Sequence, residues 1–283
     1  MSGFSADWLA LREPYDVRAR NPKVLNAVVE SFKGYPSLRI VDLACGTGST
    51  LRALGARLAA PQNWRLADND LGLLARATMM IRPAGLTVEG VPLDLNRDLE
   101  AVLDGPVDLV ATSALLDLVS GVWLERLAVE IAARAIPLYA ALSYDGRVEI
   151  GPADPLDAVI ISAVNAHQRT NKGFGPALGP AAGSAAIKQF EKLDYSVVHG
   201  ASDWVIGEGD HDIQMEIISG WASAAREIGD LSLPDTAAWL TRRRDLVSNG
   251  RSSIRVGHVD VFARPMGKRW VDRSQSNSTS SPS

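Results

Sequence analysis

The chain alternates between apolar segments of two kinds. LRIVDLAC (38–45) is a continuous apolar run rich in β-branched residues, which is typical of a strand buried on both faces. The same strand pattern recurs in WRLAD, TVEGVPLD, VDLVATSALL and PLYAALSYDG. Helical patterns separate these strands, namely LRALGARLAA, LGLLARATMMI, DLEAVL and WLERLAVEIAARA. Five strands alternating with helices predict right-handed βαβ crossovers and a doubly wound parallel sheet.

The flanking regions add helices and two more strands. Residues 5–33 predict two short helices, broken near Pro14 and Pro22, which cover the core as a lid. Beyond Asp145, helical patterns recur, and YSVVHGASDWVI and RVGHVDVFARP predict two edge strands. We therefore expect an α/β fold: a doubly wound, mostly parallel seven-stranded sheet with helices on both faces, an N-terminal helical lid, and helical insertions after the fifth strand and before the last strand.

No internal repeat and no clear linker interrupts this pattern, which predicts a single domain over residues 1–266. It divides into N-terminal helices (1–34), a ligand-binding half (37–145) and a region of insertions and edge strands (146–266). The last segment, DRSQSNSTSSPS, has almost nothing to bury, so we expect residues 267–283 to be disordered.

Composition narrows the classes of function. A content of 46% hydrophobic and 22% charged residues is typical of a soluble globular protein, and the net charge of -4 argues against a nucleic-acid partner. Cys45 stands alone and the four histidines are scattered, so the sequence predicts no disulfide within the chain and no metal site. It predicts neither a signal peptide nor a membrane span, so we expect a cytoplasmic protein with no membrane partner. The oligomeric state stays open.

The turn after the first strand, VDLACGTGST, holds the strongest motif. Gly46 and Gly48 let a ligand approach the backbone where strand meets helix, beyond the carboxyl ends of the strands. Asp68 follows about twenty residues later at the end of the second strand, where a carboxylate can accept hydrogen bonds from ribose hydroxyls. The alternative is that Asp68 caps the next helix, unless Asp70 takes that position.

The glycine spacing separates the candidate nucleotides. A dinucleotide fingerprint needs a third glycine, but Leu51 stands in its place, and no GK[ST] follows to form a Walker A loop. Asp42 within the turn would repel a pyrophosphate and can pair with an ammonium group. The pattern favours a cationic ligand over NAD, and an NAD-dependent oxidoreductase remains the less favoured alternative.

Four segments in order, VDLACGTGS, LADND, PLDL and VDLVATSALLDLV, resemble the motifs of class I S-adenosylmethionine-dependent methyltransferases. The resemblance covers residues 37–145 and implies a Rossmann-like fold, S-adenosyl-L-methionine as the cofactor, and methyl transfer. It implies that Asp42, Ala44, Gly46 and Gly48 contact the methionine end of the cofactor and that Asp68 contacts the ribose. It further implies adenine contacts from Asn69, Asp94 and Leu95, and contacts near the sulfonium from Ser113 and Leu116. For Asp94, a turn before Asn96 is the alternative.

Methyl transfer is an in-line displacement that depends mainly on placing the acceptor, so a general base is optional. The candidates for a base are His167, Asp117 and Tyr144. The candidates for binding the acceptor are Asn165, Arg169, Lys172 and Trp204, and Arg12 is the candidate for the methionine carboxylate. The alternatives are a hydrogen-bonded structural role for His167, core packing for Trp204 and a solvated helix face for Arg12.

The segment after the fourth strand reads TSALLD and lacks the [N/D]PP[Y/F] element of enzymes that methylate DNA bases or glutamine amides. We therefore expect a methyltransferase (EC 2.1.1.-) that acts on an oxygen or nitrogen of a small-molecule acceptor. The alternative is a protein that binds S-adenosylmethionine without turning it over, because binding and turnover share the same motif residues.

Overall fold

A mixed eight-stranded sheet forms the centre of the protein in a computed structural model that describes residues 4–59, 61–79 and 84–267. The strand order is β3-β2-β1-β4-β5-β8-β6, and the short strand β7 pairs with β8 outside this path. The strands are β1 (Leu38–Leu43), β2 (Gln62–Asp68), β3 (Leu86–Pro92), β4 (Leu109–Ser113), β5 (Leu138–Gly151), β6 (Tyr195–Ala201), β7 (Trp204–Ile206) and β8 (Ser253–Pro265). The first five are parallel, as predicted, and β8 is antiparallel to its neighbours.

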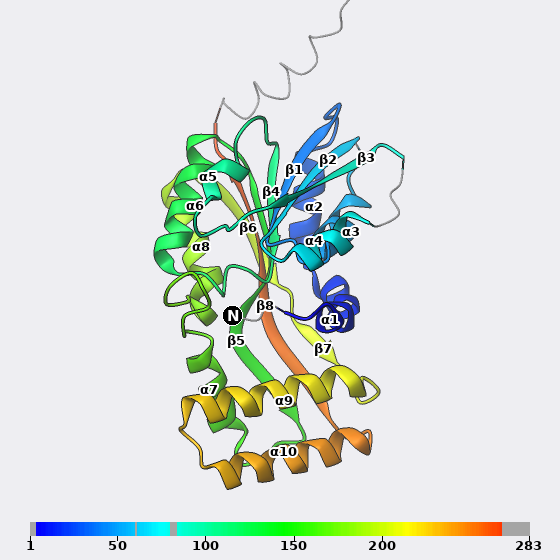
Figure 1. The fold of residues 1–283 in the computed structure, drawn as a ribbon, viewed down its shortest axis with the longest axis vertical. Coiled ribbons are helices and arrows are strands. Elements are labelled where there is room, and N and C mark those ends of the chain that lie inside the picture. Colours follow the sequence, from blue (N-terminus) through cyan, green and yellow to red (C-terminus); the bar gives the residue numbers. More distant parts are fainter. Residues whose placement is uncertain (1–3, 60, 80–83, 268–283) are drawn as a thin grey trace, which may run out of the picture.

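Helices cover both faces of the sheet (Figure 1). One face packs against α5 (Leu99–Val102), α6 (Gly121–Ala133) and α8 (Ala182–Lys192). The other packs against α2 (Pro22–Ser31), α3 (Ser49–Gly55) and α4 (Leu71–Thr78). Alternate residues of β1 enter the two cores, with Val41 in one and Ile40 in the other, which explains the uninterrupted apolar run. The doubly wound α/β prediction is confirmed.

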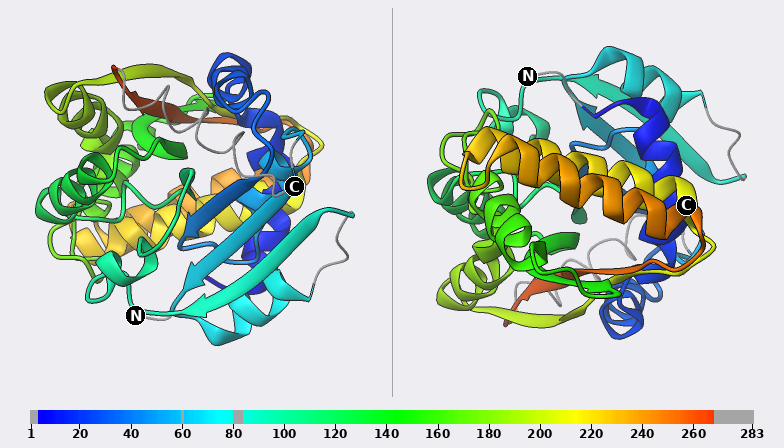
Figure 2. Two further views of the ribbon diagram at one scale, coloured as in Figure 1. Left: turned by 90° about the horizontal axis from the view of Figure 1, so that it is seen from above. Right: turned by 90° about the horizontal axis from the view of Figure 1, so that it is seen from below.

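The strands β5 and β8 continue beyond the parallel sheet as a long antiparallel ribbon, and the short strand β7 pairs with the other side of β8 there. The ribbon packs against α7 (Asp157–His167), α9 (His211–Ile228) and α10 (Leu233–Ser248), where a third apolar cluster includes Ile160, Ile213, Trp239 and Ile254. Figure 2 shows α9 and α10 side by side across the base of the molecule. The insertions after residue 146 therefore form a helical layer of their own below the sheet.

Three details differ from the sequence prediction. The last strand, β8, was expected at an edge of the sheet, but it lies between β5 and β6. The helix α1 (Ala6–Ala19) runs through Pro14 without a break, and only Pro22 begins a new helix. YSVVHGASDWVI forms two strands, β6 and β7, because Ser202 leaves the ladder and its N–H bonds the His258 carbonyl. The sheet consequently has eight strands, one more than predicted. The predicted disorder of the tail lies outside the described residues, except for Gly267.

Within the described ranges, no helix is both long and apolar enough to cross a membrane.

Candidate cofactor and acceptor site

The glycine turn takes a left-handed backbone at three positions. Ala44, Gly46 and Gly48 have φ angles of 52°, 52° and 82°. Gly48 is also the N-cap of α3, and no side chain caps that helix. The turn therefore presents a helix N-terminus at the carboxyl edge of the sheet, as the sequence predicts for a ligand-binding turn.

Ala114 and Leu142 have φ angles of 51° and 56°, and they follow or belong to β4 and β5. Asp260 of β8 supports this conformation, because its Oδ1 accepts a hydrogen bond of 2.8 Å from the Leu142 N–H. Ala44 and Ala114 thus take this costly conformation directly after β1 and β4, and Leu142 takes it at the register shift within β5. Ala135 and Asp194, before β5 and β6, share this conformation, so the strain accompanies the glycine turn at this edge and does not identify the site by itself.

Asp68 fixes the glycine turn from the neighbouring strand. Its Oδ2 accepts a hydrogen bond of 2.8 Å from the Gly46 N–H, and its Oδ1 accepts one of 2.9 Å from the Asp70 N–H. Asp70, and not Asp68, caps α4 through hydrogen bonds from the N–H groups of Gly72 and Leu73. Asp68 thus lies at the junction of β2 and the turn, with both oxygens bonded to backbone.

Asp42 lies beneath the turn and is not exposed to solvent. Neither of its carboxylate oxygens forms a hydrogen bond to a described residue. Burial raises its pKa to about 8, although Arg20 nearby opposes the shift. The predicted pairing of Asp42 with an ammonium group therefore has no counterpart among the described residues and stays a prediction. Cys45 is also buried, and burial raises its pKa, so it packs as a small apolar residue.

The other predicted cofactor residues lie along the same edge in different settings. Asn69 is exposed after β2, and Asp94 forms a turn in which its Oδ1 accepts a hydrogen bond of 2.9 Å from the Asn96 N–H. Leu95 and Leu116 are buried in the core. Ser113 ends β4, and its hydroxyl lies 2.9 Å from that of Thr50 in α3. The structure thus brings together β1, β2 and β4 as the sequence implies, with Leu95 and Leu116 contributing packing.

Helix α1 lies across the glycine turn. A β-carbon at Gly46 would come within 3.2 Å of Leu9 Cδ1. Glu13 forms an ion pair with Arg52 of α3, and Arg52 also donates a hydrogen bond of 2.6 Å to the Thr47 carbonyl. This places α1 where the sequence predicted a covering helix.

The arginines near α1 differ in their contacts. Arg12 pairs with Asp16 at 3.0 Å and lies over the Trp204 ring, with 4.8 Å from its Cζ to the ring centroid. Arg20 was not among the predicted site residues, yet it is the arginine that reaches β4. Its guanidinium donates hydrogen bonds of 2.8 Å to the Ser113 hydroxyl and 3.1 Å to the Tyr139 hydroxyl.

Asp117 lies in the loop after β4, and it is 6% exposed with an Oδ1 that has no hydrogen-bond partner among the described residues. Burial raises its pKa to about 6, while backbone N–H groups, including that of Tyr144, and the charge of Arg12 oppose the shift. Tyr144 of β5 is also buried, and its hydroxyl donates a hydrogen bond of 2.8 Å to Asn165 Oδ1 on α7. The structure therefore brings the predicted residues Asp117, Tyr144 and Asn165 into one region.

His258 of β8 belongs to this region, and sequence reasoning missed it. Its ring lies 6.1 Å from that of Tyr144 and 5.0 Å from that of Trp204, between centroids. Burial lowers its pKa to about 3, so the ring is neutral, and its Nδ1 lies 3.1 Å from the Val256 carbonyl as the donor. The signal was present in RVGHVDVFARP, where His258 and Asp260 alternate with valines in the middle of a predicted strand, and both side chains are buried.

His167 lies apart from Asp117. Its Nε2 is 2.9 Å from Glu227 of α9 and its Nδ1 is 3.2 Å from Lys172 Nζ, so it joins α7, α9 and the following loop. Arg169 is exposed, and its guanidinium donates a hydrogen bond of 3.0 Å to the Asn165 carbonyl. These contacts match the structural alternative for His167 and give it no contact with the Asp117 region.

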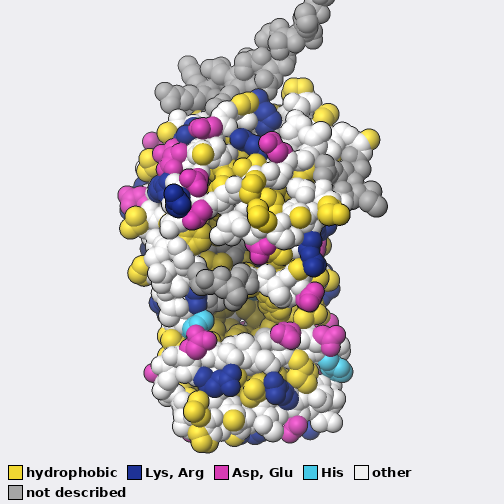
Figure 3. All heavy atoms as spheres, viewed as in Figure 1, with side chains coloured by type: hydrophobic (Ala, Val, Ile, Leu, Met, Phe, Trp, Pro, Cys, Tyr) yellow, Lys and Arg dark blue, Asp and Glu magenta, His cyan; other side chains and the backbone are white. Residues whose placement is uncertain are grey.

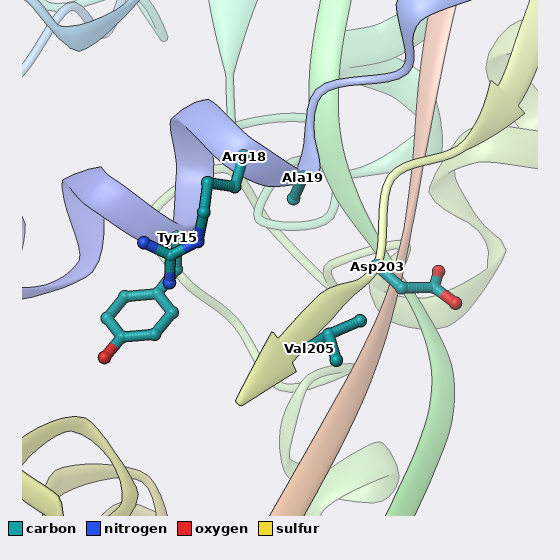
Figure 4. A pocket seen from close by; sticks show the side chains of 5 residues that line it. All are labelled: Tyr15, Arg18, Ala19, Asp203 and Val205. Carbon is teal, nitrogen blue, oxygen red and sulfur yellow. The ribbon is translucent and has the colours of Figure 1, made fainter. Parts of the chain in front are cut away.

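Figure 3 shows a hollow between the sheet and the α9–α10 layer, with hydrophobic side chains at its margin. A separate cavity of about 180 Å³ lies between α1 and β7, where Tyr15 and Arg18 extend side by side and Asp203 points away from them (Figure 4). Another, of about 390 Å³, lies between α9 and α10. A search of the described residues for metal-binding groups of three or more His, Cys, Asp or Glu finds none.

The fold is similar to that of solved structures. The backbone is similar to that of a cyclopropane-fatty-acyl-phospholipid synthase-like protein from Lactobacillus casei ATCC 334, with a TM-score of 0.53 and 14% identity over 92% of this chain and 94% of that chain. The chain has the fold of class I methyltransferases. At this identity the similarity describes the fold alone.

Two further structures are similar at lower scores. A methyltransferase from Thiobacillus denitrificans, solved with S-adenosyl-L-homocysteine, has a TM-score of 0.46 and 15% identity over 94% of this chain and 99% of its own. A cyclopropane synthase from Mycobacterium tuberculosis has a TM-score of 0.48 and 12% identity over 92% of this chain and 95% of its own. No protein-family model and no curated protein matches the sequence significantly.

Proposed function

We propose that the protein binds S-adenosyl-L-methionine at the carboxyl edge of β1, β2 and β4 and transfers its methyl group to an oxygen or nitrogen of a small-molecule acceptor. The observation that carries the proposal is the glycine turn held open by Asp68 at the end of β2, within the class I fold. The four motifs that resemble those of the family all fall at this one edge. S-adenosylmethionine supplies the electrophilic methyl group when it is bound.

The chain's own residues then perform three tasks. The glycine turn and the neighbouring strand ends position the cofactor, with Asp68 toward the ribose and Asn69 and Asp94 toward the adenine. Helix α1 covers the turn and limits the access of water, since the ion pair of Glu13 and Arg52 holds it there. Where the acceptor must lose a proton to react, Asp117 is the candidate base, because its Oδ1 has no hydrogen-bond partner among the described residues and burial raises its pKa to about 6.

Asp117 is therefore our preferred base, and it supports an oxygen or nitrogen acceptor over a carbon one, because O–H and N–H groups are the donors that a carboxylate can deprotonate directly. Tyr144 is a second candidate, but burial raises the pKa of its hydroxyl, which keeps it protonated and makes it a donor. Asn165, Arg169, Lys172 and Trp204 remain proposed acceptor-side residues.

The test is calorimetric titration of the purified protein with S-adenosylmethionine, with NAD as the comparison ligand, followed by detection of S-adenosylhomocysteine after incubation with a mixed metabolite extract. We expect micromolar binding of S-adenosylmethionine, no binding of NAD, and extract-dependent product. Binding without product would favour a non-catalytic binding protein, and binding of NAD alone would contradict the assignment of the site.

A further inference from the structure

Arg12 and Asp117 are buried opposite charges that do not pair with each other. Arg12 is 8% exposed and Asp117 is 6% exposed. The ion pair of Arg12 is with Asp16, and Asp117 has no ion-pair partner within the described part of the chain. A buried carboxylate without an ion-pair partner is costly, and the charge of Arg12 is close enough to oppose the rise that burial causes in the pKa of Asp117.

The donors and acceptors left over on the two residues are complementary. Arg12 uses Nε and Nη2 to bond Asp16, and its Nη1 makes no hydrogen bond to a described residue. Asp117 keeps Oδ1 free, while the N–H of Gly179 bonds its backbone carbonyl at 3.0 Å and holds the loop. One group therefore offers a charged donor and the other a charged acceptor.

The surroundings are aromatic and rigid. Trp204 lies against Arg12 on one side and His258 on the other, and Tyr144 continues the row. Trp204 Nε1 also donates a hydrogen bond of 2.9 Å to Asp16 Oδ1, which fixes the orientation of the Arg12–Asp16 pair. Because His258 is neutral, it adds no second positive charge that would compete with Arg12.

We propose that Arg12 and Asp117 form the two ends of an acceptor subsite, which takes a small planar molecule that presents an O–H or N–H group to Asp117 and an anionic oxygen to Arg12. This inference rests on the proposed methyl transfer and assigns Arg12 to the acceptor, not to the methionine carboxylate. In the reaction, the acceptor oxygen or nitrogen forms a bond to the methyl carbon as the S–CH3 bond breaks, and its proton passes to Asp117 Oδ1.

The experiment measures ligand binding to protein saturated with S-adenosylhomocysteine, whose own affinity is determined first. The probes are 2-hydroxybenzoate, which has both groups, and benzoate and phenol, which have one each. We expect 2-hydroxybenzoate to bind most tightly. Arg12→Gln should weaken the binding of 2-hydroxybenzoate and of benzoate about tenfold, because it removes one charge-assisted contact, and it should leave the binding of phenol unchanged. Asp117→Asn should remove the advantage of 2-hydroxybenzoate over benzoate.

Two further variants separate a binding role from a folding role. Arg12→Lys keeps the charge and should restore part of the carboxylate preference. Arg18→Gln removes an arginine from the same helix that stacks on Tyr15, and it should change none of the affinities. The inference is overturned if none of the probes binds the saturated protein, or if Arg12→Gln and Arg18→Gln change the probe affinities equally. It is also overturned if Arg12→Gln weakens the binding of S-adenosylhomocysteine. Failure of the wild-type protein to bind S-adenosylhomocysteine would instead defeat the proposed function.

Discussion

The cofactor edge and the acceptor side of this protein are built by different means. At the cofactor edge, Asp68 and Asp70 bond backbone N–H groups within or next to the turn and the following helix. On the acceptor side, groups far apart in sequence meet, such as Asp16 with Trp204 and Asp157 with Arg243. The first region depends on local chain geometry, and the second depends on buried charges that must be paired.

This difference predicts that the two regions fail separately. Changes at the cofactor edge should reduce affinity for S-adenosylmethionine with a modest effect on folding. Changes in the buried charges below the sheet should reduce the free energy of unfolding with little effect on cofactor affinity. Helix α1 contacts both regions, so substitutions in α1 should affect both the cofactor affinity and the free energy of unfolding.

The largest effect is expected from Arg243→Met in α10. Arg243 is fully buried, pairs with Asp157, and donates a hydrogen bond of 2.7 Å to the Pro152 carbonyl. Its removal takes the charged partner from Asp157, whose carboxylate is 14% exposed and keeps hydrogen bonds from Trp239 Nε1 and the Asp154 N–H, so the free energy of unfolding should fall by about 3 kcal/mol. Denaturant unfolding measures this, and calorimetry of the folded variant should show unchanged cofactor affinity.

The matched control is Arg242→Met, whose arginine pairs with Asp154 but is 47% exposed. It should have a much smaller effect on unfolding. Equal effects of the two substitutions would show that burial of the charge does not set the stability of the lower layer.

The next effect is a pH dependence from Asp117. Its folded pKa of about 6 lies above the ordinary value, so the unfolded chain releases this proton first as the pH rises. The contribution of this group to the free energy of unfolding should therefore fall by about 2 to 3 kcal/mol between about pH 4 and pH 6 and then level, whereas the contribution of Asp42, with its pKa raised to about 8, continues to fall above pH 6. Asp117→Asn should flatten that part of the curve in denaturant titrations, and in the active enzyme it should abolish the rise in rate near pH 6.

Asp68→Ala should weaken S-adenosylmethionine binding by about 1.5 to 3 kcal/mol, because it removes charge-assisted hydrogen bonds to the glycine turn and to the bound ribose. The control is Asp70→Ala, which removes the cap of α4 and should cost about 1 kcal/mol of folding stability with unchanged cofactor affinity. Calorimetry and denaturant unfolding of both variants distinguish these roles. Unchanged affinity in Asp68→Ala would contradict the site.

The smallest effect is expected from Glu13→Gln, which loosens α1 from Arg52. The side chain of Glu13 is 23% exposed, so the loss in cofactor affinity should be about 0.5 kcal/mol. Glu30→Gln is the control, because its pair with Lys33 is exposed and lies on α2. A measurable loss in the control as well would remove the case that α1 supports the glycine turn.

The sequence by itself determined the parallel half of the sheet and the location of the glycine turn. Both are local: the apolar run of β1 and the glycines after it lie within 38–48, and Asp70 caps the helix that directly follows it. Hydrophobic periodicity and turn chemistry act over a few residues, so they can be interpreted without tertiary contacts.

Only the tertiary structure decided which polar residues share the acceptor side. It placed His258 next to Tyr144, put Arg12 over Trp204, and joined His167 to Glu227. These partners are separated by 60 or more residues. The β5–β8 ribbon pairs Tyr144 with His258, whereas the packing of α1 on β7 and of α7 on α9 brings the other two pairs together. Local pattern fixes the element on which a residue lies, whereas the register and packing of distant elements decide what its side chain meets.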